Sequence, residues 1–454
     1  MDKSMIDKMA SEQHSQHPAK VAYIVSAFPA LSETFVLYEM IAMEKLGVRI
    51  ELYPLRRLRE KECHPEAKRW IERAHYHPFL SLQMLAAHWR FIRRSPIRYF
   101  KLWSEVLRGT FGSLNFFLGA LAIFPKAGFF AQQMLEQGVT HVHAHFANHP
   151  TVAALIIHRL TGIPFSFSAR GTDIQVDRHM LKQKIDAAEF VVSVSLHNKQ
   201  LMVAECGRRV ERKIEVVHGG VDVDRLRPRP KFAAGLFRIL CVARFEEVKG
   251  HAYLIAACER LRKRGVRFEC RLIGSGPLAS AIREQIRRAR LEGQILILGE
   301  RAYPDVITEL SQADVVVLPT APTSSGKREG IPNVLKEAMA CELPVIATAA
   351  GGIPELVTCE TGVLVPPRDP DALALALEHL SKDRILCQQL GQAARRRVVE
   401  KFNLNDSVAR RALLFLSSGR ARRQPRPAGN SKTLFVPDCT MFARDQRTST
   451  GLPQ

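Results

Sequence analysis

The segment Ser324-Ser-Gly-Lys-Arg-Glu-Gly-Ile-Pro-Asn-Val-Leu-Lys-Glu-Ala-Met-Ala-Cys341 decides the fold of the second half of the chain. It follows the apolar run Val315–Pro319, which has the composition of a buried strand. Its serines and glycines permit a tight loop, Pro332 suits the first turn of a helix, and Asn333 begins a helical pattern. We therefore predict a strand, a loop and a helix whose first amide groups point into a cleft.

Short apolar runs alternate with helix-patterned stretches on both sides of this segment, which is typical of parallel sheets flanked by helices. The strands expected in the first half are Lys20–Phe28, Val48–Leu55, His141–Phe146, Phe165–Ala169, Phe190–Val194 and Ile214–His218. Those expected in the second half are Arg238–Ala243, Phe268–Ile273, Ile295–Leu298, Val315–Pro319 and Pro344–Ala347. We predict an α/β fold of two doubly wound, Rossmann-like domains that face a cleft.

Composition places the domain boundaries. Residues 225–235 are rich in Arg, Pro and Lys, and the prolines oppose both helix and sheet, so we expect the linker there. This gives an N-terminal domain at 20–224 and a C-terminal domain at 236–415. Residues 1–19 form a polar extension. The Arg, Pro, Ser and Gly content of 416–454 predicts a disordered tail.

Charge and cysteine usage limit the cellular setting. The chain has 454 residues, 66 Lys and Arg against 45 Asp and Glu, and a formal charge of +21. This excess suits nucleic acid, anionic lipid or a phosphate-rich ligand equally well. The nine cysteines are scattered without metal-ligand spacing, and Met1–Lys20 lacks the apolar core of a secretory signal. We expect a cytoplasmic protein without a disulfide framework.

Two stretches of the first half bear on membranes. The most apolar window, Phe111–Phe130, is interrupted by Pro125 and Lys126, and what remains is too short to cross a bilayer of roughly 30 Å, so we expect a buried or interfacial helix. The second stretch could dock on anionic lipid, bind single-stranded nucleic acid by stacking, or form a solvated helical face with packed aromatics. It holds Trp70, Trp89 and Trp103 among Lys68, Arg69, Arg73, Arg90, Arg93, Arg94, Arg98, Lys101 and Arg108.

Two glutamates bracket the expected helix start. A helix N-terminus binds diphosphate through its unpaired N–H groups and positive dipole end. Glu329 lies in the loop and Glu337 in the helix, at most ~12 Å apart if the whole span is helical. One carboxylate can bind a sugar hydroxyl while the other binds a ribose diol. The alternative is that both are ordinary surface residues.

Further candidates follow other strands of the second half. Arg244 and Lys249 come after Leu240–Ala243, where two cations could neutralise a leaving diphosphate, or could simply be solvated. Gly274-Ser-Gly276-Pro is half of a dinucleotide fingerprint, without its third glycine and ribose acid. Ala349-Ala-Gly-Gly-Ile-Pro-Glu355 is a second glycine turn that a ligand could approach.

The order of these motifs resembles the retaining family-4 glycosyltransferases of the GT-B fold, over roughly Ala19 to Phe402. The resemblance is carried by Glu329-x7-Glu337 in EGIPNVLKEAMA, by Arg244…Lys249-Gly after a strand, and by IGSGPL, GGIPEL and TGVLVPP. Phe28-Pro-Ala-Leu-Ser-Glu-Thr-Phe35 and His141-Val-His-Ala-His-Phe-Ala147 are further similar to the colanic-acid and exopolysaccharide branch.

The resemblance implies transfer of a sugar from a nucleotide-sugar to a lipid-linked or polysaccharide-precursor acceptor, at the inner face of the plasma membrane. Retention would proceed by attack on the face that the nucleotide leaves, without an assigned nucleophile. No metal or other cofactor is expected. The implied donor site comprises Glu337 at the ribose, Glu329 at the transferred sugar, Arg244 and Lys249 at the diphosphate, and Gly330, Ile331, Asn333, Val334, Gly274 and Gly276 around them.

The N-terminal domain would supply the acceptor side. Ser32, Glu33 and Thr34 follow the first strand and could hold an acceptor hydroxyl, although the Gly-rich loop of many relatives is absent. His141, His143 and His145 alternate along a strand and therefore share one face. Metal ligation, substrate hydrogen bonding and packing all fit that pattern. We expect His145, nearest the strand end, to touch ligand.

Arg170 stands where the family has a histidine that is thought to contact the transferred sugar. Arginine only donates hydrogen bonds and stays charged, so Arg170 cannot be a base. We hypothesise that it favours a substrate with an anionic group. Asp173 keeps its family place, or simply caps the next helix.

Three alternative functions remain open from the sequence. Because Arg170 replaces the family histidine, the chain could be a nucleotide-sugar-binding protein that has lost catalysis. A GT-B epimerase would share the fold. A nucleotide-dependent oxidoreductase would need the full dinucleotide fingerprint. We expect no nucleic-acid partner, because the basic residues are not attached to a recognisable nucleic-acid-binding fold.

Overall fold

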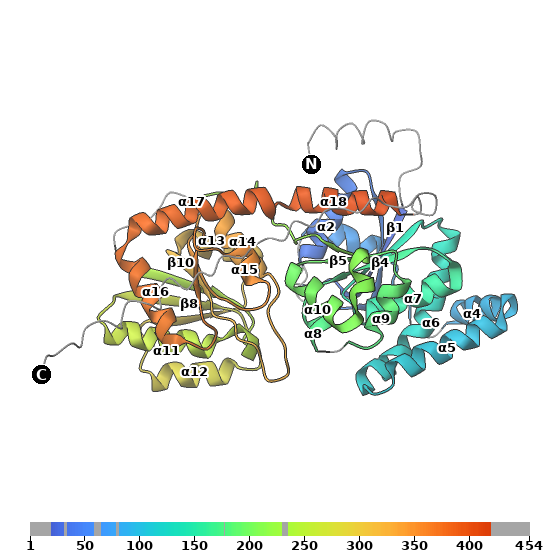
Figure 1. Cartoon of the computed structure of the whole chain (residues 1–454), viewed down its shortest axis with the longest axis horizontal. Coiled ribbons are helices and arrows are strands. Elements are labelled where there is room, and N and C mark those ends of the chain that lie inside the picture. The colour runs from blue at the N-terminus through green and yellow to red at the C-terminus, as the bar shows by residue number, and fades with distance from the viewer. Residues whose placement is uncertain are drawn as a thin grey trace, which may run out of the picture.

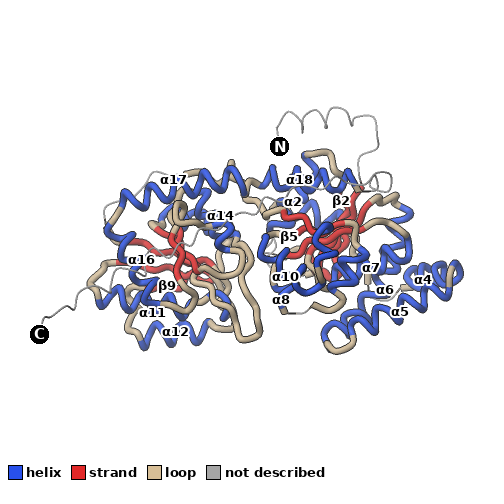
Figure 2. The backbone as a smooth tube through the Cα atoms, in the orientation of Figure 1, coloured by secondary structure: helices blue, strands red, loops and turns tan. Residues whose placement is uncertain are grey.

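The computed structural model describes residues 20–30, 34–58, 65–78, 81–176, 178–228 and 235–418. Two lobes lie side by side, each with a sheet at its centre and helices around it (Figures 1 and 2). The N-terminal sheet has the order β2-β1-β3-β4-β5-β6, and the C-terminal sheet has the order β12-β11-β10-β7-β8-β9. All paired neighbours run parallel, which confirms the predicted fold class.

The N-terminal lobe contains all six strands expected of it. They are β1 (Lys20–Phe28), β2 (Arg49–Arg57), β3 (His141–His145), β4 (Phe165–Ala169), β5 (Phe190–Ser193) and β6 (Ile214–Val216). The helices between them are α2 (Thr34–Lys45), α3 (Ala67–Arg73), α4 (Leu82–Arg94), α5 (Pro96–Thr110), α6 (Leu114–Glu136), α7 (His149–Thr161), α8 (Thr172–Gln175), α9 (Leu181–Ala187), α10 (Leu196–Cys206) and the 3-10 helix η2 (Arg208–Lys213).

Strand alternation divides this sheet into two buried faces. Ala22 and Ile24 of β1 pack with α4, α5, α6 and α7. Val21 and Tyr23 point to the other face and pack with α2, α3 and the last helix, α18 (Leu404–Ser417). Because side chains alternate along β3 in the same way, all three β3 histidines lie on the second face, together with Phe415. The predicted common face is therefore correct, and it is a packed face.

Helices α4, α5 and α6 form an insertion between β2 and β3, at the end of the molecule away from the C-terminal lobe (Figure 1). Pro125 lies inside α6, a continuous helix of 23 residues, so the expectation of a stretch too short to cross a membrane is wrong by length. By length and composition alone α6 could span a bilayer, but 56% of its apolar window is buried inside the lobe. It packs on α7, α4 and α5 as a core helix.

The C-terminal lobe contains the five expected strands and a sixth, β12. The strands are β7 (Phe237–Val242), β8 (Phe268–Ile273), β9 (Ile295–Gly299), β10 (Val315–Leu318), β11 (Val345–Thr348) and β12 (Val363–Val365). The helices are η3 (Glu247–Lys249), α11 (His251–Lys263), α12 (Ala279–Arg288), α13 (Tyr303–Gln312), α14 (Asn333–Ala340), α15 (Ile353–Leu356), α16 (Pro370–Lys382), α17 (Arg384–Lys401) and α18 (Leu404–Ser417).

The chain crosses between the lobes twice. The first crossing follows β6, and its residues 229–234, within the predicted linker, lie outside the described residues. The second joins α17 to α18, where Val221 pairs with Asn403 (Figure 1). Helix α18 then packs on α2 and β1 through Val408, Ala412 and Phe415. The predicted C-terminal domain, 236–415, is thus too long, because its last helix belongs to the N-terminal lobe.

Candidate active site

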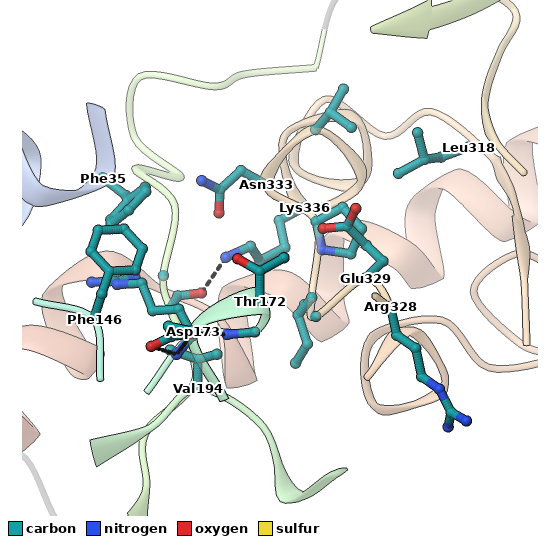
Figure 3. A pocket seen from close by; sticks show the side chains of 18 of the residues that line it. Phe35, Phe146, Thr172, Asp173, Val194, Leu318, Arg328, Glu329, Asn333 and Lys336 are labelled. Carbon is teal, nitrogen blue, oxygen red and sulfur yellow. Dashed lines mark hydrogen bonds between the residues drawn. The ribbon is translucent and has the colours of Figure 1, made fainter. Parts of the chain in front are cut away.

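A pocket of about 450 Å³ lies between the lobes. Its N-terminal wall comes from α2, α8, α18 and the ends of β3 and β4, and its C-terminal wall comes from the loops after β7 and before α14. Figure 3 shows Phe35 and Phe146 on one side, and Glu329 and Asn333 on the other. Nine of the residues predicted from the sequence line this pocket, namely Arg170, Asp173, Arg244, Lys249, Glu329, Gly330, Ile331, Asn333 and Val334.

Lys249 and Glu329 form an ion pair at the pocket wall. Lys249 ends η3, and Gly250 follows with a φ of +71° against the carbonyl oxygen of Pro319, where any side chain would overlap that oxygen. Gly351 has a φ of +59°, and a side chain there would likewise overlap the carbonyl oxygen of Glu329. The two glycines therefore fix the loops that carry the two charged groups.

A second group of charges surrounds this pair. Glu246 accepts from Lys327 at 2.7 Å, and Arg244 lies 3.3 Å from the same carboxylate. Lys327 holds the pKa of the Glu246 carboxyl below its usual range, against the effect of burial. The Arg244 side chain remains 66% exposed, so it can turn toward a ligand. This part of the pocket can bind a diphosphate through three cations and the start of α14.

Glu337 lies one turn into α14 and does not line the described pocket. Burial raises the pKa of its carboxyl to about 7. The neighbouring Lys336 does line the pocket and donates to the carbonyl oxygen of Gly219 at 2.6 Å (Figure 3). Burial, together with Arg170 and Arg411, lowers the pKa of the Lys336 ammonium to about 7.

Gly274 and Gly276 pack against a neighbouring loop. A side chain at Gly274 would overlap the carbonyl oxygen of Ala243, and one at Gly276 would press on Phe245. The glycines thus pack against the segment that carries Arg244 and do not line the pocket. Their spacing reflects close packing of two backbone loops.

Asp173 organises the N-terminal wall through backbone contacts. Its carboxylate accepts from the backbone N–H groups of Ala147 at 2.7 Å, Gly171 at 2.6 Å and Arg170 at 3.1 Å. These amides lie in the loops after β3 and β4, so Asp173 fixes both loops together. Although it lines the pocket, we classify it as a positioning residue, because its oxygens are already engaged.

Arg170 lies in the same wall, beside Phe35 and close to Glu39, Arg411 and Tyr23, of which the last three were not singled out in the sequence. Its guanidinium carbon lies 3.9 Å from the centre of the Phe35 ring, and its Nη2 lies 3.4 Å from Oε2 of Glu39. Arg411 of α18 forms an ion pair with the same oxygen, and Tyr23 donates to the other oxygen at 3.1 Å. Burial would raise the pKa of Glu39, but Arg411, His145 and Arg170 lower it to about 2.

The β3 histidines do not reach the pocket. His145 is fully buried behind Arg170, whose Nη2 donates to its Nδ1 at 3.2 Å, so the expectation that it touches ligand is wrong. His143 uses both ring nitrogens on Ser166 and Ser168, at 2.8 and 2.9 Å. Burial lowers the pKa values of His141 and His145 to about 3 and that of His143 well below its usual range. All three are neutral packing residues near pH 7.

Glu39, His143 and His145 place ligand atoms within 4.8 Å of one another, as a metal centre would. The Glu39 carboxylate is already held by two guanidinium groups and a phenol. A divalent cation there would face Arg170 and Arg411 at close range, which is electrostatically unfavourable. The cluster is better explained as an anchor for the two arginines.

The other predicted acceptor residues fall at the margin of the site. Ser32 and Glu33 lie outside the described residues. Thr34 begins α2 and is half-buried, and it does not line the pocket. The next residue, Phe35, does line it. Phe35 therefore supplies the observed contact of this segment with the pocket.

Direct contacts hold the two lobes around the pocket. Glu355 of α15 accepts from the backbone N–H groups of Leu196 and His197, at 2.7 and 2.8 Å, at the start of α10. Nε2 of His218 lies 3.0 Å from the same carboxylate. The backbone N–H of Arg328 donates to Gln175 of α8 at 2.7 Å. The glycine turn of the C-terminal lobe thus caps a helix of the other lobe.

Solved structures share this arrangement of two lobes. A glycosyltransferase from Rickettsia africae ESF-5 superposes with a TM-score of 0.66 at 18% identity, covering 88% of this chain and 98% of that one. HepE of Anabaena in complex with UDP gives a TM-score of 0.65 at 17% identity, covering 88% and 100%. Two parallel-sheet lobes with a pocket between them are the GT-B fold, which these solved structures share.

Relatives in sequence define the family. Residues 222–397 match the family described as Glycosyl transferases group 1. The chain is 31% identical over 408 residues to WcaL of Escherichia coli K12, named as a colanic acid biosynthesis glycosyltransferase, covering 85% of this chain and 96% of that one. It is 35% identical over 193 residues to the amylovoran biosynthesis glycosyltransferase AmsK of Erwinia amylovora, covering 42% and 47%. The chain belongs to the group 1 glycosyltransferases, and it has relatives in exopolysaccharide biosynthesis.

Proposed function

We propose that this glycosyltransferase moves a sugar from a nucleotide-sugar to a lipid-linked or polysaccharide-precursor acceptor in cell-surface polysaccharide biosynthesis. The observation that carries the proposal is the Lys249–Glu329 ion pair beside the start of α14, inside the pocket between the lobes. The helix start and Lys249 would hold the diphosphate, and Glu329 would bind the transferred sugar. Glu337 would bind the ribose.

The test is a donor screen with the purified protein. UDP-, GDP- and ADP-sugars are added singly, and thermal stabilisation and release of the free nucleotide are measured. We expect one nucleotide class to raise the melting temperature and to be turned over slowly without acceptor. If no donor stabilises the protein or is consumed, the proposed donor site is wrong.

We propose further that transfer retains the anomeric configuration. Each of the four carboxylates in the described lining of the pocket is engaged: Glu39 with arginines, Asp173 with amides, and Glu246 and Glu329 with cations. This supports attack on the face that the nucleotide leaves, since a covalent nucleophile needs a carboxylate directed at the sugar. The anomeric signal of the product, followed by NMR, distinguishes retention from inversion.

The reaction would proceed without a bound metal ion. The diphosphate charge is met by Lys249, Lys327 and Arg244, which supply the neutralisation that a divalent cation would provide. We expect the turnover rate to be unchanged when EDTA is added to protein purified without metal. Loss of turnover with EDTA, and its recovery with Mg²⁺ or Mn²⁺, would reject this part of the proposal.

A membrane-bound acceptor would be reached through helices α4 to α6. Their outward faces carry exposed apolar side chains, among them Trp89, Ile97, Phe100 and Phe111, at 60%, 82%, 60% and 80% exposure. Residues 82–136 hold seven Lys and Arg but two Glu. Apolar side chains flanked by cations suit an anionic bilayer surface. We therefore propose peripheral binding at the cytoplasmic face of the plasma membrane.

Vesicle flotation tests this surface. Wild-type protein should float with vesicles that contain phosphatidylglycerol, and salt should weaken the binding, because screening acts over about 10 Å at 0.1 M. The Trp89→Ser/Phe100→Ser variant should float less. Leu375→Ser, which removes a similarly exposed side chain from α16 in the other lobe, is the matched control. Equal flotation of wild type and the double variant would contradict the assignment.

A further inference from the structure

The pocket has a second group of charged residues besides those of the diphosphate loops. We define this cationic floor as Arg170, Arg411 and Lys336, which come from the end of β4, from α18 and from α14. Arg411 and Lys336 are each 2% exposed. All three line the pocket, so a bound molecule can reach them.

The floor carries more positive than negative charge. Glu39 is the carboxylate that pairs with both guanidinium groups. In the part of the chain that the structure describes, Lys336 has no ion-pair partner within 4.0 Å, and its hydrogen bond goes to the carbonyl oxygen of Gly219. These three cations line the pocket beside two carboxylates, Glu39 and Asp173, and the Asp173 carboxylate is occupied by backbone N–H groups. Buried charge of one sign is costly unless a ligand supplies the other.

The neighbours of the floor suit a sugar ring. Phe35 and Phe146 lie beside Arg170, with their ring centres 3.9 and 6.0 Å from its guanidinium carbon. Aromatic faces pack against the apolar face of a pyranose and also hold the guanidinium plane in place. Asp173 fixes the backbone N–H of Arg170 at 3.1 Å. The floor is therefore oriented before any ligand binds.

We propose that the cationic floor binds the carboxylate of a hexuronic acid, carried either by the acceptor or by the transferred sugar. This rests on the proposed transferase function and names the substrate class of the same pocket. A carboxylate can accept a charge-assisted hydrogen bond from the Arg170 guanidinium and gains a second contact from Lys336.

The experiment compares acidic and neutral sugars. Methyl glucuronoside and methyl glucoside are titrated into UDP-saturated wild-type protein by calorimetry, and UDP-glucuronate and UDP-glucose are titrated in parallel. We expect at least tenfold tighter binding of the acidic member in one of the two pairs. A preference in the glycoside pair assigns the carboxylate to the acceptor, and a preference in the nucleotide pair assigns it to the donor.

Variants connect the preference to the floor. At pH 6, where the Lys336 ammonium is charged, Arg170→Gln and Lys336→Gln should each reduce it to below threefold, because each removes one cation. Arg396→Gln on the exposed face of α17 should leave it intact. Melting temperatures identify a variant that fails to fold. Lys336 is more buried than Arg170. If Lys336→Gln fails to fold, the result for Arg170→Gln alone tests the proposal.

Two failures can be told apart. If the protein binds a nucleotide-sugar but has equal affinity for acidic and neutral sugars, the cationic floor does not bind a carboxylate. The proposed transferase function is then unaffected. A preference for the uronate in a protein that binds no nucleotide-sugar overturns the donor site and leaves the floor standing. Tighter binding of glucose 6-phosphate than of methyl glucuronoside overturns the assignment to a carboxylate.

Discussion

At the scale of single residues, the two groups of charges that line the pocket have different partners. Lys249 pairs with one acidic residue, Glu329, in a partly exposed setting. Lys336 is buried, and within the described residues its hydrogen bond goes to the carbonyl oxygen of Gly219. A leaving diphosphate gains charge during the reaction, whereas a substrate carboxylate does not change. Lys249 should therefore affect the rate, and the floor should affect the choice of substrate.

We predict that Lys249→Ala lowers kcat by about 10²- to 10³-fold, the effect of removing one fixed donor from developing charge. Lys249→Arg should also be impaired, because a planar fork does not replace a compact ammonium beside Glu329. Steady-state kinetics at saturating donor measure both variants, and thermal unfolding monitors their folding. Wild-type kcat in both would show that Lys249 has no part in diphosphate departure.

Glu337 gives a prediction with a pH dependence. Burial raises the pKa of its carboxyl to about 7, so the ionised acceptor that a ribose diol needs forms as pH rises through 7. Affinity for the nucleotide-sugar should increase from pH 6 to pH 8. In Glu337→Gln the affinity should be about 1.5–3 kcal/mol weaker at pH 8, since a charged hydrogen bond is lost.

Calorimetric titration at several pH values measures the affinity for the nucleotide-sugar. Lys336 titrates in the same range, and it loses charge as pH rises, which would weaken anion binding. The Gln variant separates the two groups, because only the rise with pH that depends on Glu337 disappears. An affinity that falls steadily with pH in wild type would assign the dependence to Lys336.

At the scale of elements, α18 and α15 matter most, because each connects the two lobes. Helix α18 follows the C-terminal lobe in sequence but packs on the N-terminal sheet and supplies Arg411. Helix α15 places Glu355 at the start of α10, where it accepts from two backbone N–H groups. Burial would raise the pKa of Glu355, but His218 and these two amides hold it below its usual range. The capping carboxylate therefore stays ionised.

We predict that Glu355→Ala lowers the free energy of unfolding by about 1 kcal/mol, as the loss of a helix cap does, and also separates the lobes. Asp369→Ala is the matched control, since Asp369 accepts from two amides at the start of α16 within one lobe. Small-angle X-ray scattering should show a larger radius of gyration for Glu355→Ala alone. Equal radii for the two variants would mean that Glu355 does not hold the lobes together.

At the scale of the whole molecule, the sequence predicted what depends on local pattern. Eleven of the twelve strands were expected, and the one that was missed, β12, is three residues long. Glu329 and Lys249 were expected at the cleft because the residues next to them in sequence form recognisable loop patterns, and both line the pocket. The pattern at Gly274 and Gly276 is ambiguous, because a glycine pair after a strand has the same spacing whether a ligand or a second loop approaches it.

The long-range part of the site could not be derived in this way. Periodicity marks α18 as amphipathic, but it does not say which lobe receives the helix. Glu39 and Arg411 do leave a signal, since each is a charge at a core position of an apolar helix face. Opposite charges of this kind on two helices predict that the helices meet. The β3 histidines share one face as expected, but alternation does not tell a packed face from a cleft.

The three β3 histidines should make the stability of the whole protein sensitive to acid. Burial holds their pKa values far below 6.5, so they stay neutral in the folded chain while the unfolded chain binds protons below pH 6.5. Each group therefore removes up to about 1.4 kcal/mol of stability per pH unit as pH falls from 6.5 toward 4.5. Glu39, with a pKa of about 2, adds its own loss only below pH 4.5.

Urea unfolding at half-unit steps of pH should show that the free energy of unfolding falls by up to about 4 kcal/mol per pH unit because of the three β3 histidines. His141→Asn should reduce the slope by about one third, whereas His379→Gln, exposed on α16, should leave it unchanged. A stability that is constant between pH 6.5 and 4.5 would mean that these histidines take up protons without unfolding the lobe.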